Sequence, residues 1–312
     1  MRLAFALFLV LLIGTVAACG GGASESTQSN KNEQRIVTLS PAASKILIDL
    51  GLGDSIVGRH NYDQAARAEV KPVGDQSSID YELLLSLRPT HVVVQTDSRS
   101  VPERLAEFAK ASGFEIVNIS RTLTLDDVER ATRELEAQFA PGAGLAAKLH
   151  EAIAPRDEDH SAWGTVLVAM QTAPTVDVLG PGSAHQELIE RLGYAPTVTQ
   201  GLPYMPMDAE DVLALDPGVI VLVLPRAPGA PVAPMDWEPT ETDLGSLAGL
   251  GLRAVEMGRV VVIDDPLALV PSTSFVGVSA ELSRRLAALG PLGSQHDDRD
   301  DDTDDEPEAG PG

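Results

Sequence analysis

The sequence predicts an α/β protein made of two similar lobes with parallel sheets. Segments 79–94 and 207–222 share aspartate, glutamate, two leucines and proline in the same register, and each leads into a run of β-branched residues. The two copies lie about one domain length apart, too far for a solenoid repeat. Runs such as Val92–Val94 are apolar without alternation, which is typical of a parallel strand covered on both faces. A two-lobed chain of this kind has a groove between its lobes, where ligands bind.

Each copy of the repeat has the pattern of a short, capped helix. An aspartate before the helix can accept the unpaired N–H groups of the first turn, and a glutamate two residues later suits the positive end of the helix dipole. A proline then ends the helix and turns the chain into a strand. The acidic residues are Asp80 and Glu82 in the first copy, and Asp208 and Glu210 in the second.

Strands alternating with helices predict βαβ units along the rest of the chain. In the first half we expect strands at 35–39, 56–58, 91–95 and 115–119, and helices at 42–50 and 101–112 besides the first repeat helix. In the second half we expect strands at 164–170, 175–179, 218–224 and 259–263, and helices at 183–192, 246–254 and 274–289 besides the second.

Helical periodicity also runs over 125–139 and continues over 144–153 after a break at Pro141-Gly142, so this region is expected to connect the lobes. The expected boundaries are 35–124 for the N-terminal lobe, 125–155 for the connecting helix region and 156–292 for the C-terminal lobe.

Residues 1–18 have the charged start, apolar run and small residues of a signal peptide. The apolar run is shorter than the roughly 20 residues that span a membrane. Val16–Cys19 resembles a bacterial lipobox, in which the cysteine is lipidated; an ordinary secretory signal with a chance cysteine is the alternative. Residues 19–34 are rich in Gly, Ser, Asn and Gln, and predict a flexible tether.

Composition excludes several classes of function. Cys19 is the only cysteine, so the mature fold has no disulfide and no thiol catalysis. Segment 293–312 is dominated by Asp and Glu and is predicted to be disordered, as a solubilising tail or a weak cation binder. The formal net charge of −23 makes nucleic acid an unexpected partner, because phosphate binding needs basic surface.

Several motifs together carry a family resemblance. Segment 35–47, RIVTLSPAASKIL, resembles the opening of the class III periplasmic substrate-binding proteins, which serve ABC importers for cobalamin, ferric siderophores and haem. Segments 50–58 and 258–264, Val73-Gly74 before the first repeat copy, and Gly180–Ser183 before a helix fit the same pattern. The resemblance covers nearly all of 35–289 and depends on the order and spacing of the motifs.

The resemblance implies two Rossmann-like lobes joined by a single long helix, with the ligand held in the groove between them and no catalysis or cofactor. It implies a monomer, lipid-anchored at the periplasm or outer cell surface, that delivers its ligand to an ABC permease dimer. One exposed glutamate in each lobe docks on the permease in this family, which nominates Glu82 and Glu210. The alternative is that both glutamates only complement helix dipoles.

Ligands of open α/β sheets gather at the carboxyl ends of the strands, which nominates a set of loop residues. Aromatic side chains matter because a flat chelate needs apolar faces, although some of these residues could instead be loop packing. A serine at a helix start could cradle an anion or only cap the helix. The candidates are Ser40, Pro41, His60, Tyr62, Asp75, Gln95, Ser183, His185, Tyr204, Met205 and Trp237.

His60 and His185 are the histidines expected to face each other across the groove. Imidazole can ligate cobalt, iron or zinc, and an exposed loop position is the alternative for each. With carboxylates they would also suit a binder of bare zinc or manganese, a second hypothesis that the family pattern disfavours. No other metal site is predicted.

Cobalamin or another corrinoid is the favoured ligand, with ferric siderophores next. Siderophore sites often use several arginines, and here only Arg59, Arg121 and Arg226 fall near the predicted groove. Asp75 stands where haem binders of the family commonly have tyrosine, which disfavours haem. A secreted α/β enzyme is the remaining alternative, but the sequence has no nucleophile elbow, phosphate loop or zinc-protease motif.

Overall fold

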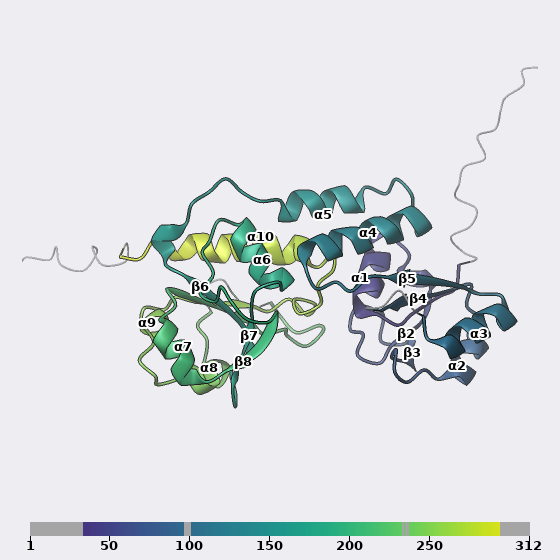
Figure 1. Cartoon of the computed structure of the whole chain (residues 1–312), viewed down its shortest axis with the longest axis horizontal. Coiled ribbons are helices and arrows are strands. Elements are labelled where there is room, and N and C mark those ends of the chain that lie inside the picture. The colour runs from purple at the N-terminus through teal and green to yellow at the C-terminus, as the bar shows by residue number, and fades with distance from the viewer. Residues whose placement is uncertain (1–33, 97–100, 233, 235–236, 294–312) are drawn as a thin grey trace, which may run out of the picture.

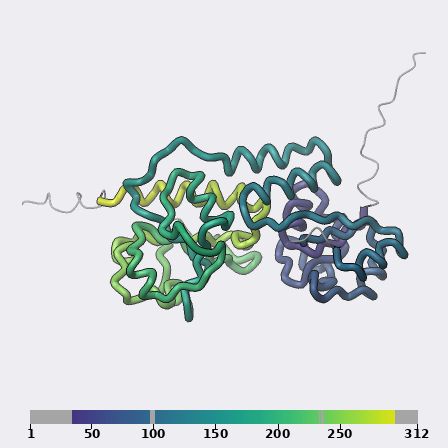
Figure 2. The backbone as a smooth tube through the Cα atoms, viewed as in Figure 1, coloured from purple at the N-terminus to yellow at the C-terminus, as the bar shows by residue number. Residues whose placement is uncertain are grey.

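A computed structural model describes residues 34–96, 101–232, 234 and 237–293. Two α/β lobes lie side by side, and a layer of helices runs along one side of both (Figures 1 and 2). The predicted signal peptide, Cys19 and nearly all of the tether and acidic tail lie outside the described residues. No described helix is both long and apolar enough to cross a membrane.

The N-terminal lobe contains a five-stranded sheet in the order β3-β2-β1-β4-β5, and every neighbouring pair is parallel, as predicted. Adjacent residues such as Ile36 and Val37 enter separate cores on opposite faces of this sheet. Because both faces are covered, the inner strand β4 is apolar without alternation over Val92–Val94. The elements are β1 (Ile36–Thr38), α1 (Pro41–Asp49), β2 (Ile56–His60), β3 (Lys71–Gly74), α2 (Tyr81–Ser86), β4 (His91–Gln95), α3 (Glu103–Ser112) and β5 (Glu115–Ile119).

The C-terminal lobe has a five-stranded sheet in the order β10-β9-β6-β7-β8. Strands β6, β9 and β10 are parallel, but β7 is antiparallel to β6, and β8 is antiparallel to β7. The prediction of a parallel sheet is therefore wrong for one side of this lobe. Only residues 172–175 join β6 to β7, and a parallel crossover needs a dozen or more.

Helices flank this second sheet and complete the lobe. The elements are β6 (Val166–Gln171), β7 (Val176–Leu179), α6 (Ala184–Arg191), β8 (Tyr204–Met207), α7 (Ala209–Leu215), β9 (Val219–Val223), α8 (Glu241–Leu244), α9 (Arg253–Glu256), β10 (Val260–Ile263) and α10 (Phe275–Leu289).

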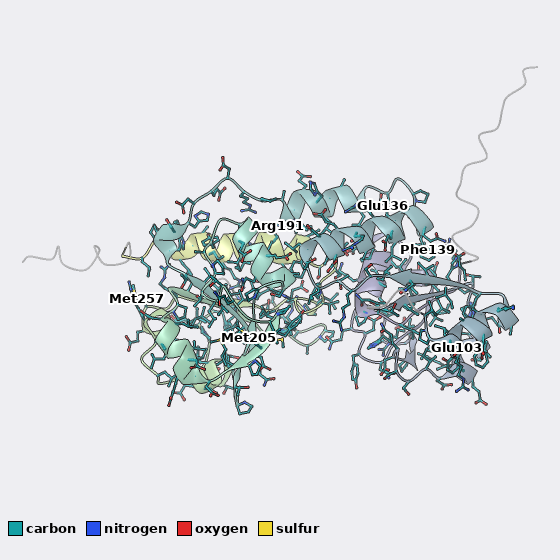
Figure 3. All side chains as sticks on the ribbon, viewed as in Figure 1. Glu103, Glu136, Phe139, Arg191, Met205 and Met257 are labelled. Atoms are coloured by element: carbon teal, nitrogen blue, oxygen red, sulfur yellow. The ribbon has the colours of Figure 1, made fainter. Side chains whose placement is uncertain are left out.

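The connector is a pair of helices, α4 (Leu125–Phe139) and α5 (Leu145–Ile153), that lie alongside each other (Figure 1). The predicted break at Pro141-Gly142 is confirmed: Gly142 and Gly144 have φ of 83° and 79°, left-handed values that suit glycine and reverse the chain. The single long helix that the family resemblance implies is therefore wrong for this chain, which has two helices here. Glu136, labelled in Figure 3, accepts hydrogen bonds from the backbone N–H groups of Gly144 and Ala146, each at 2.7 Å, and so fixes the start of α5.

Helix α4 contributes to the cores of both lobes. Leu125 and Val128 belong to the C-terminal core, whereas Ala131, Leu135 and Phe139 belong to the N-terminal core. The side chain of Thr124 caps the helix in a reciprocal capping box with residue 127. The two lobes are therefore joined by continuous apolar packing as well as by the covalent chain.

The repeated segments form α2 and α7, short helices on the side of the molecule away from α5 (Figure 1). Asp80 caps α2 as expected, accepting the Leu83 N–H at 2.9 Å. Asp208 occupies the equivalent position before α7, but its side chain makes no capping hydrogen bond, so that prediction is wrong. Glu82 and Glu210 are exposed at the second position of each helix.

One arginine is buried at the end of the C-terminal lobe. Arg259 is 1% exposed, and its guanidinium donates to the carbonyls of Gly218, Leu289 and Gly290 at 3.0, 3.2 and 2.9 Å. The last two carbonyls lie at the carboxyl end of α10, where a positive charge also suits the helix dipole. Arg259 therefore fastens α10 to the sheet.

We expect Arg259→Gln to lower the free energy of unfolding by about 3 kcal/mol, because buried carbonyls lose charge-assisted donors. Urea unfolding followed by circular dichroism measures this loss. Arg133→Gln is the control: it removes the same charge from a side chain that is 63% exposed. Equal stability of the two variants would contradict a structural role for Arg259.

Candidate functional site

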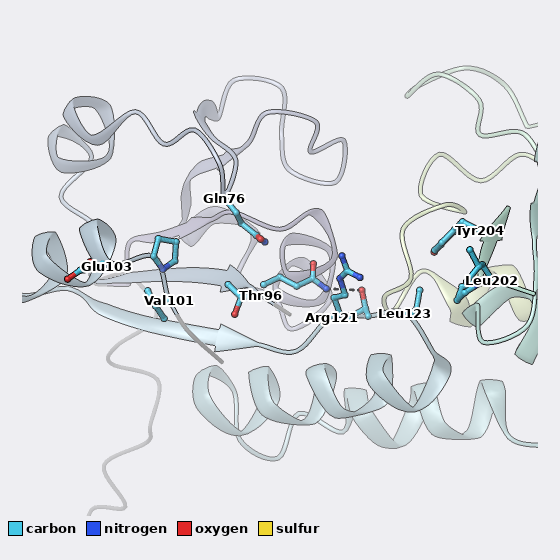
Figure 4. Close-up of a pocket in the computed structure, with 12 residues that line it drawn as sticks. Gln76, Thr96, Val101, Glu103, Arg121, Leu123, Leu202 and Tyr204 are labelled. Carbon is cyan, nitrogen blue, oxygen red and sulfur yellow. Dashed lines mark hydrogen bonds between the residues drawn. The ribbon is translucent and has the colours of Figure 1, made fainter. Parts of the chain in front are cut away.

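A cleft of about 1090 Å³ lies between the lobes (Figure 4). Its volume is slightly above the range of roughly 300–1,000 Å³ that is common for small-molecule sites. The N-terminal lobe and the residues after β5 contribute most of the lining, and the segment ahead of β8 forms the opposite wall. The lining residues are Gln76, Gln95, Thr96, Val101, Pro102, Glu103, Arg121, Thr122, Leu123, Leu202, Pro203 and Tyr204.

Gln95 organises the N-terminal wall at the carboxyl ends of β1, β4 and β5. Its side-chain oxygen accepts a hydrogen bond from Ser40 Oγ at 2.8 Å, and its nitrogen donates to Thr122 Oγ1 at 3.0 Å and to the Ser120 carbonyl at 3.4 Å. Both amide hydrogens thus have acceptors within the protein. The network ties three strand ends together at the floor of the cleft.

A close backbone approach holds the C-terminal wall. The Gly180 N–H donates to the Pro203 carbonyl at 2.9 Å, and a Cβ at position 180 would lie only 2.6 Å from the Leu202 carbonyl oxygen. Residue 180 must therefore be glycine for this wall to sit where it does. Tyr204 then begins β8 and pairs with Leu179 at the end of β7.

Hydrogen bonds between the lobes set the position of the two walls. The Ala184 N–H at the start of α6 donates to the Leu123 carbonyl at 2.7 Å. On another part of the interface, Thr273 Oγ1 donates to Asp49 Oδ2 at 2.6 Å, and Asp49 is also paired with Lys45. The spacing between the cleft walls is thus built into the folded chain.

Tyr204 and Arg121 face the cleft from opposite lobes (Figure 4). Tyr204 is 42% exposed. Partial burial raises the pKa of its phenol, and the nearby positive charge of Arg121 lowers this pKa in opposition. Tyr204 is therefore a neutral phenol near neutral pH and can donate a hydrogen bond.

Of the predicted ligand-binding residues, Gln95 and Tyr204 line the cleft. Ser40 is buried behind it, where its Oγ bonds Gln95 and accepts the Ala43 N–H that starts α1, and Pro41 is the first residue of that helix. These two residues support the floor without forming it.

Three further candidates lie outside the lining, one at the end of β2 and two in the loops after β2 and β3. Tyr62 is 79% exposed, and its ring lies 5.8 Å from that of His60. Asp75 forms a turn with Ser77 and Ser78, and hydrogen bonds from Ser77 lower the pKa of its carboxyl. His60 is half-buried; its pKa is lowered by burial, against the opposing charges of Asp75 and Asp63.

His185 does not face His60 across the groove. It is 5% exposed, its Nε2 bonds the Ala268 carbonyl at 2.7 Å, and its ring packs edge-on against Phe275. Burial lowers the pKa of His185 to about 4, so the ring is neutral near neutral pH. Ser183 is fully buried and caps α6 by accepting the Gln186 N–H at 3.2 Å.

Two remaining candidates lie elsewhere in the C-terminal lobe. Met205 follows Tyr204 but packs beneath the turn at Gly201, where a Cβ would meet its sulfur at 2.7 Å. Trp237 lies against a separate pocket with Gly258 and Val260, at the amino end of β10. The structure therefore places Trp237 away from the cleft.

Several lining residues were not among the predicted site residues. Thr96, Arg121 and Thr122 follow β4 and β5, so the rule of strand carboxyl ends contains the signal for them. Val101–Glu103 and Leu202–Pro203 enter the lining through tertiary packing, for which the local sequence has no signal. Within the described part of the chain, no group of three or more His, Cys, Asp or Glu could hold a metal ion.

A sequence model described as periplasmic binding protein matches residues 36–267. The vitamin B12-binding protein of Vibrio cholerae is 33% identical over 97 residues, covering 30% of this chain and 34% of that protein. The match thus spans about a third of the length of this curated relative.

Solved structures show the same fold. The heme-binding protein HutB of Vibrio cholerae gives a TM-score of 0.61 at 18% identity, covering 83% of this chain and 99% of that chain. The vitamin B12-binding protein BtuF of Vibrio cholerae gives 0.54 at 20% identity, covering 82% and 97%.

We expect the stability of the protein to fall as the pH drops from 6.5 towards 4 because of His185. The unfolded histidine takes up a proton near pH 6.5, whereas the folded one resists until about 4, so the unfolded state binds more protons in this window. The loss over the window is about 3 kcal/mol. Urea unfolding at a series of pH values measures it.

His185→Gln should flatten this pH dependence, because the neutral amide does not titrate. His150→Gln is the control, since His150 is 67% exposed and its removal should leave most of the slope. An unchanged slope in His185→Gln would contradict the burial of a neutral His185.

Proposed function

The chain belongs to the periplasmic binding protein family, and we propose that it captures a metal chelate between its lobes and delivers it to the permease dimer of an ABC importer. The observation that carries the proposal is the 1090 Å³ cleft, which is lined by both lobes of the family fold. The function is binding and delivery, with no chemical step.

A corrinoid is the ligand that the cleft supports best. Of the three arginines considered for an anionic siderophore, Arg59 donates to the Val70 carbonyl at 2.8 Å, and Arg226 pairs with Asp264 at 3.0 Å. Within the described lining, only Arg121 carries a positive charge. A mostly uncharged, amide-rich chelate suits such a wall better than a multiply charged siderophore, and a curated relative is a vitamin B12-binding protein.

Haem is the second candidate, for a specific reason. Solved structures with the same fold include heme-binding proteins, and Tyr204 places a phenol in the cleft. Tyrosine is a known haem ligand. Bare zinc or manganese is not taken further, because His185 is buried away from His60.

We also propose that Glu82 and Glu210 dock on the permease. They occupy equivalent positions on α2 and α7, one in each lobe, and both are exposed. The two helices lie on the side of the molecule away from α5 (Figure 1). A matched pair of carboxylates suits arginines on two permease subunits. A lipid on Cys19 would hold the monomer at the outer face of the membrane.

We expect cyanocobalamin to raise the melting temperature of the purified protein more than haemin, ferric siderophores or zinc do. A ligand that binds only the folded state must stabilise it. A thermal-shift panel measures this. Leu202→Asp should weaken the shift, whereas Val232→Asp, at a residue of similar exposure outside the lining, should not. If zinc raises the melting temperature and none of the chelates does, the proposal is wrong.

We expect the double variant Glu82→Ala with Glu210→Ala to reduce uptake of the chelate by at least about tenfold and to leave its binding affinity unchanged. Charges at the edge of an interface affect association with the permease and do not contact the chelate in the cleft. Uptake in cells and titration of the purified protein separate the two effects. The control pair is Glu107→Ala with Glu241→Ala, one exposed glutamate from each lobe on other helices. Normal uptake in the first pair would end the docking proposal.

A further inference from the structure

Arg121 lines the cleft, whereas Arg59 and Arg226 lie outside its described lining. Arg59 is bound by backbone carbonyls within its own lobe, including that of Asp63 at 2.9 Å, and Arg226 is paired with the buried Asp264. Arg121 instead lies in the cleft lining, after the carboxyl end of β5. It brings a positive charge into the cleft of a protein whose formal net charge is −23.

The backbone that carries Arg121 is held from both sides. Gln95 donates to the Ser120 carbonyl at 3.4 Å and to Thr122 Oγ1 at 3.0 Å, so one amide bonds the residues immediately before and after Arg121. Ser40 in turn fixes Gln95 at 2.8 Å. Gln95 is therefore a positioning residue for Arg121.

Tyr204 provides a second donor on the opposite wall. Figure 4 shows Arg121 and Tyr204 facing each other across the space between the lobes. The positive charge of Arg121 lowers the pKa of the Tyr204 phenol, against the larger effect of burial, which raises this pKa. A guanidinium and a neutral phenol can bind the same oxyanion, the first with a charge-assisted fork and the second with one O–H.

The cleft is also asymmetric in charge. Glu103, at the start of α3, lies at the other end of the lining from Arg121 (Figure 4). Apolar side chains, among them Val101, Pro102 and Leu202, line the space around these charges. A ligand with an apolar body and one acidic edge would therefore bind in one orientation, with its acidic edge away from Glu103.

We propose that Arg121 and Tyr204 form an oxyanion subsite that reads a single peripheral phosphate or carboxylate on the bound chelate. This inference rests on the proposed function and specifies the ligand further. A corrinoid would present the phosphodiester of its nucleotide loop, and a haem would present a propionate. The shared chemistry is one oxyanion on the edge of a large, mostly apolar chelate.

The test compares two pairs of chelates in which one member lacks the oxyanion. Cyanocobalamin is paired with dicyanocobinamide, and haemin with its dimethyl ester. Titration calorimetry should show that the wild-type protein prefers the acidic member of the pair it binds by about tenfold. Arg121→Gln should reduce this preference to about unity, Tyr204→Phe should reduce it in part, and Arg133→Gln should leave it unchanged.

Two further measurements separate a direct role from a structural one. Added salt should weaken binding of the acidic chelate and spare its partner, because the contact is between charges. The phenol of Tyr204, followed by ultraviolet absorbance, should titrate at higher pH in Arg121→Gln. Arg121→Lys, which keeps the charge but loses the planar fork, should retain part of the preference.

Each outcome has a defined meaning. If Arg121→Gln prefers the acidic chelate as strongly as the wild type does, the subsite is overturned and the proposed function stands. Equal loss of affinity for both members of a pair also overturns it, because Arg121 would then only shape the cleft. If the wild type binds none of the four chelates, the corrinoid and haem assignments fail, and the subsite fails with them; the proposed function itself fails only if no metal chelate in the thermal-shift panel binds either.

Discussion

The packing of α4 into both lobes is the constraint on which the rest of the structure depends. Its first turns complete the C-terminal core through Leu125 and Val128, and its later turns complete the N-terminal core through Leu135 and Phe139. Neither core is complete without this helix, and close-packed cores do not deform gradually. The angle between the lobes, and with it the width of the cleft, is therefore set by the same contacts that stabilise the fold. Glu187 on α6 adds a polar tie between the C-terminal lobe and the start of α4 by accepting the Leu125 N–H at 2.8 Å.

Much of the fold was predictable because its signals are local. Apolar runs without alternation marked the parallel strands. The proline within each repeated segment marked the end of the helix, α2 or α7. The errors arose where distant contacts decide the outcome. The break at Pro141-Gly142 marked two helices in 125–153, whereas the family resemblance implied one. The packing of the two side by side depends on the left-handed Gly142 and Gly144 and on contacts of α5 with α10. The two similar repeats likewise lead into different sheets, one parallel and one mixed, although the strand that follows each repeat has parallel neighbours.

The predictions of site residues also succeeded where the signal is local and failed where distant contacts decide the outcome. Gln95 and Tyr204 were predictable because they follow or begin strands next to the groove. His185 was nominated by its place at the start of a helix, yet its burial depends on Ala268 and Phe275, which are more than 80 residues away in sequence. Trp237 was nominated for its aromatic ring, but its loop packs at the amino end of β10. Residue type and local pattern thus identified chemistry, and only the tertiary fold decided which side chains share a cavity.

The two walls of the cleft are held in place by contacts within the protein. Gln95 has both amide hydrogens engaged within the protein, so its main contribution is to hold the backbone on either side of Arg121. Gly180 acts in the same way on the other wall, since only a residue without Cβ lets the Leu202 carbonyl approach so closely. Such preorganisation lowers the ordering cost of binding, because the walls are in place before the ligand arrives. The subsite that we propose around Arg121 depends on this order, because a charge held in one place can select a ligand by the position of its acidic group.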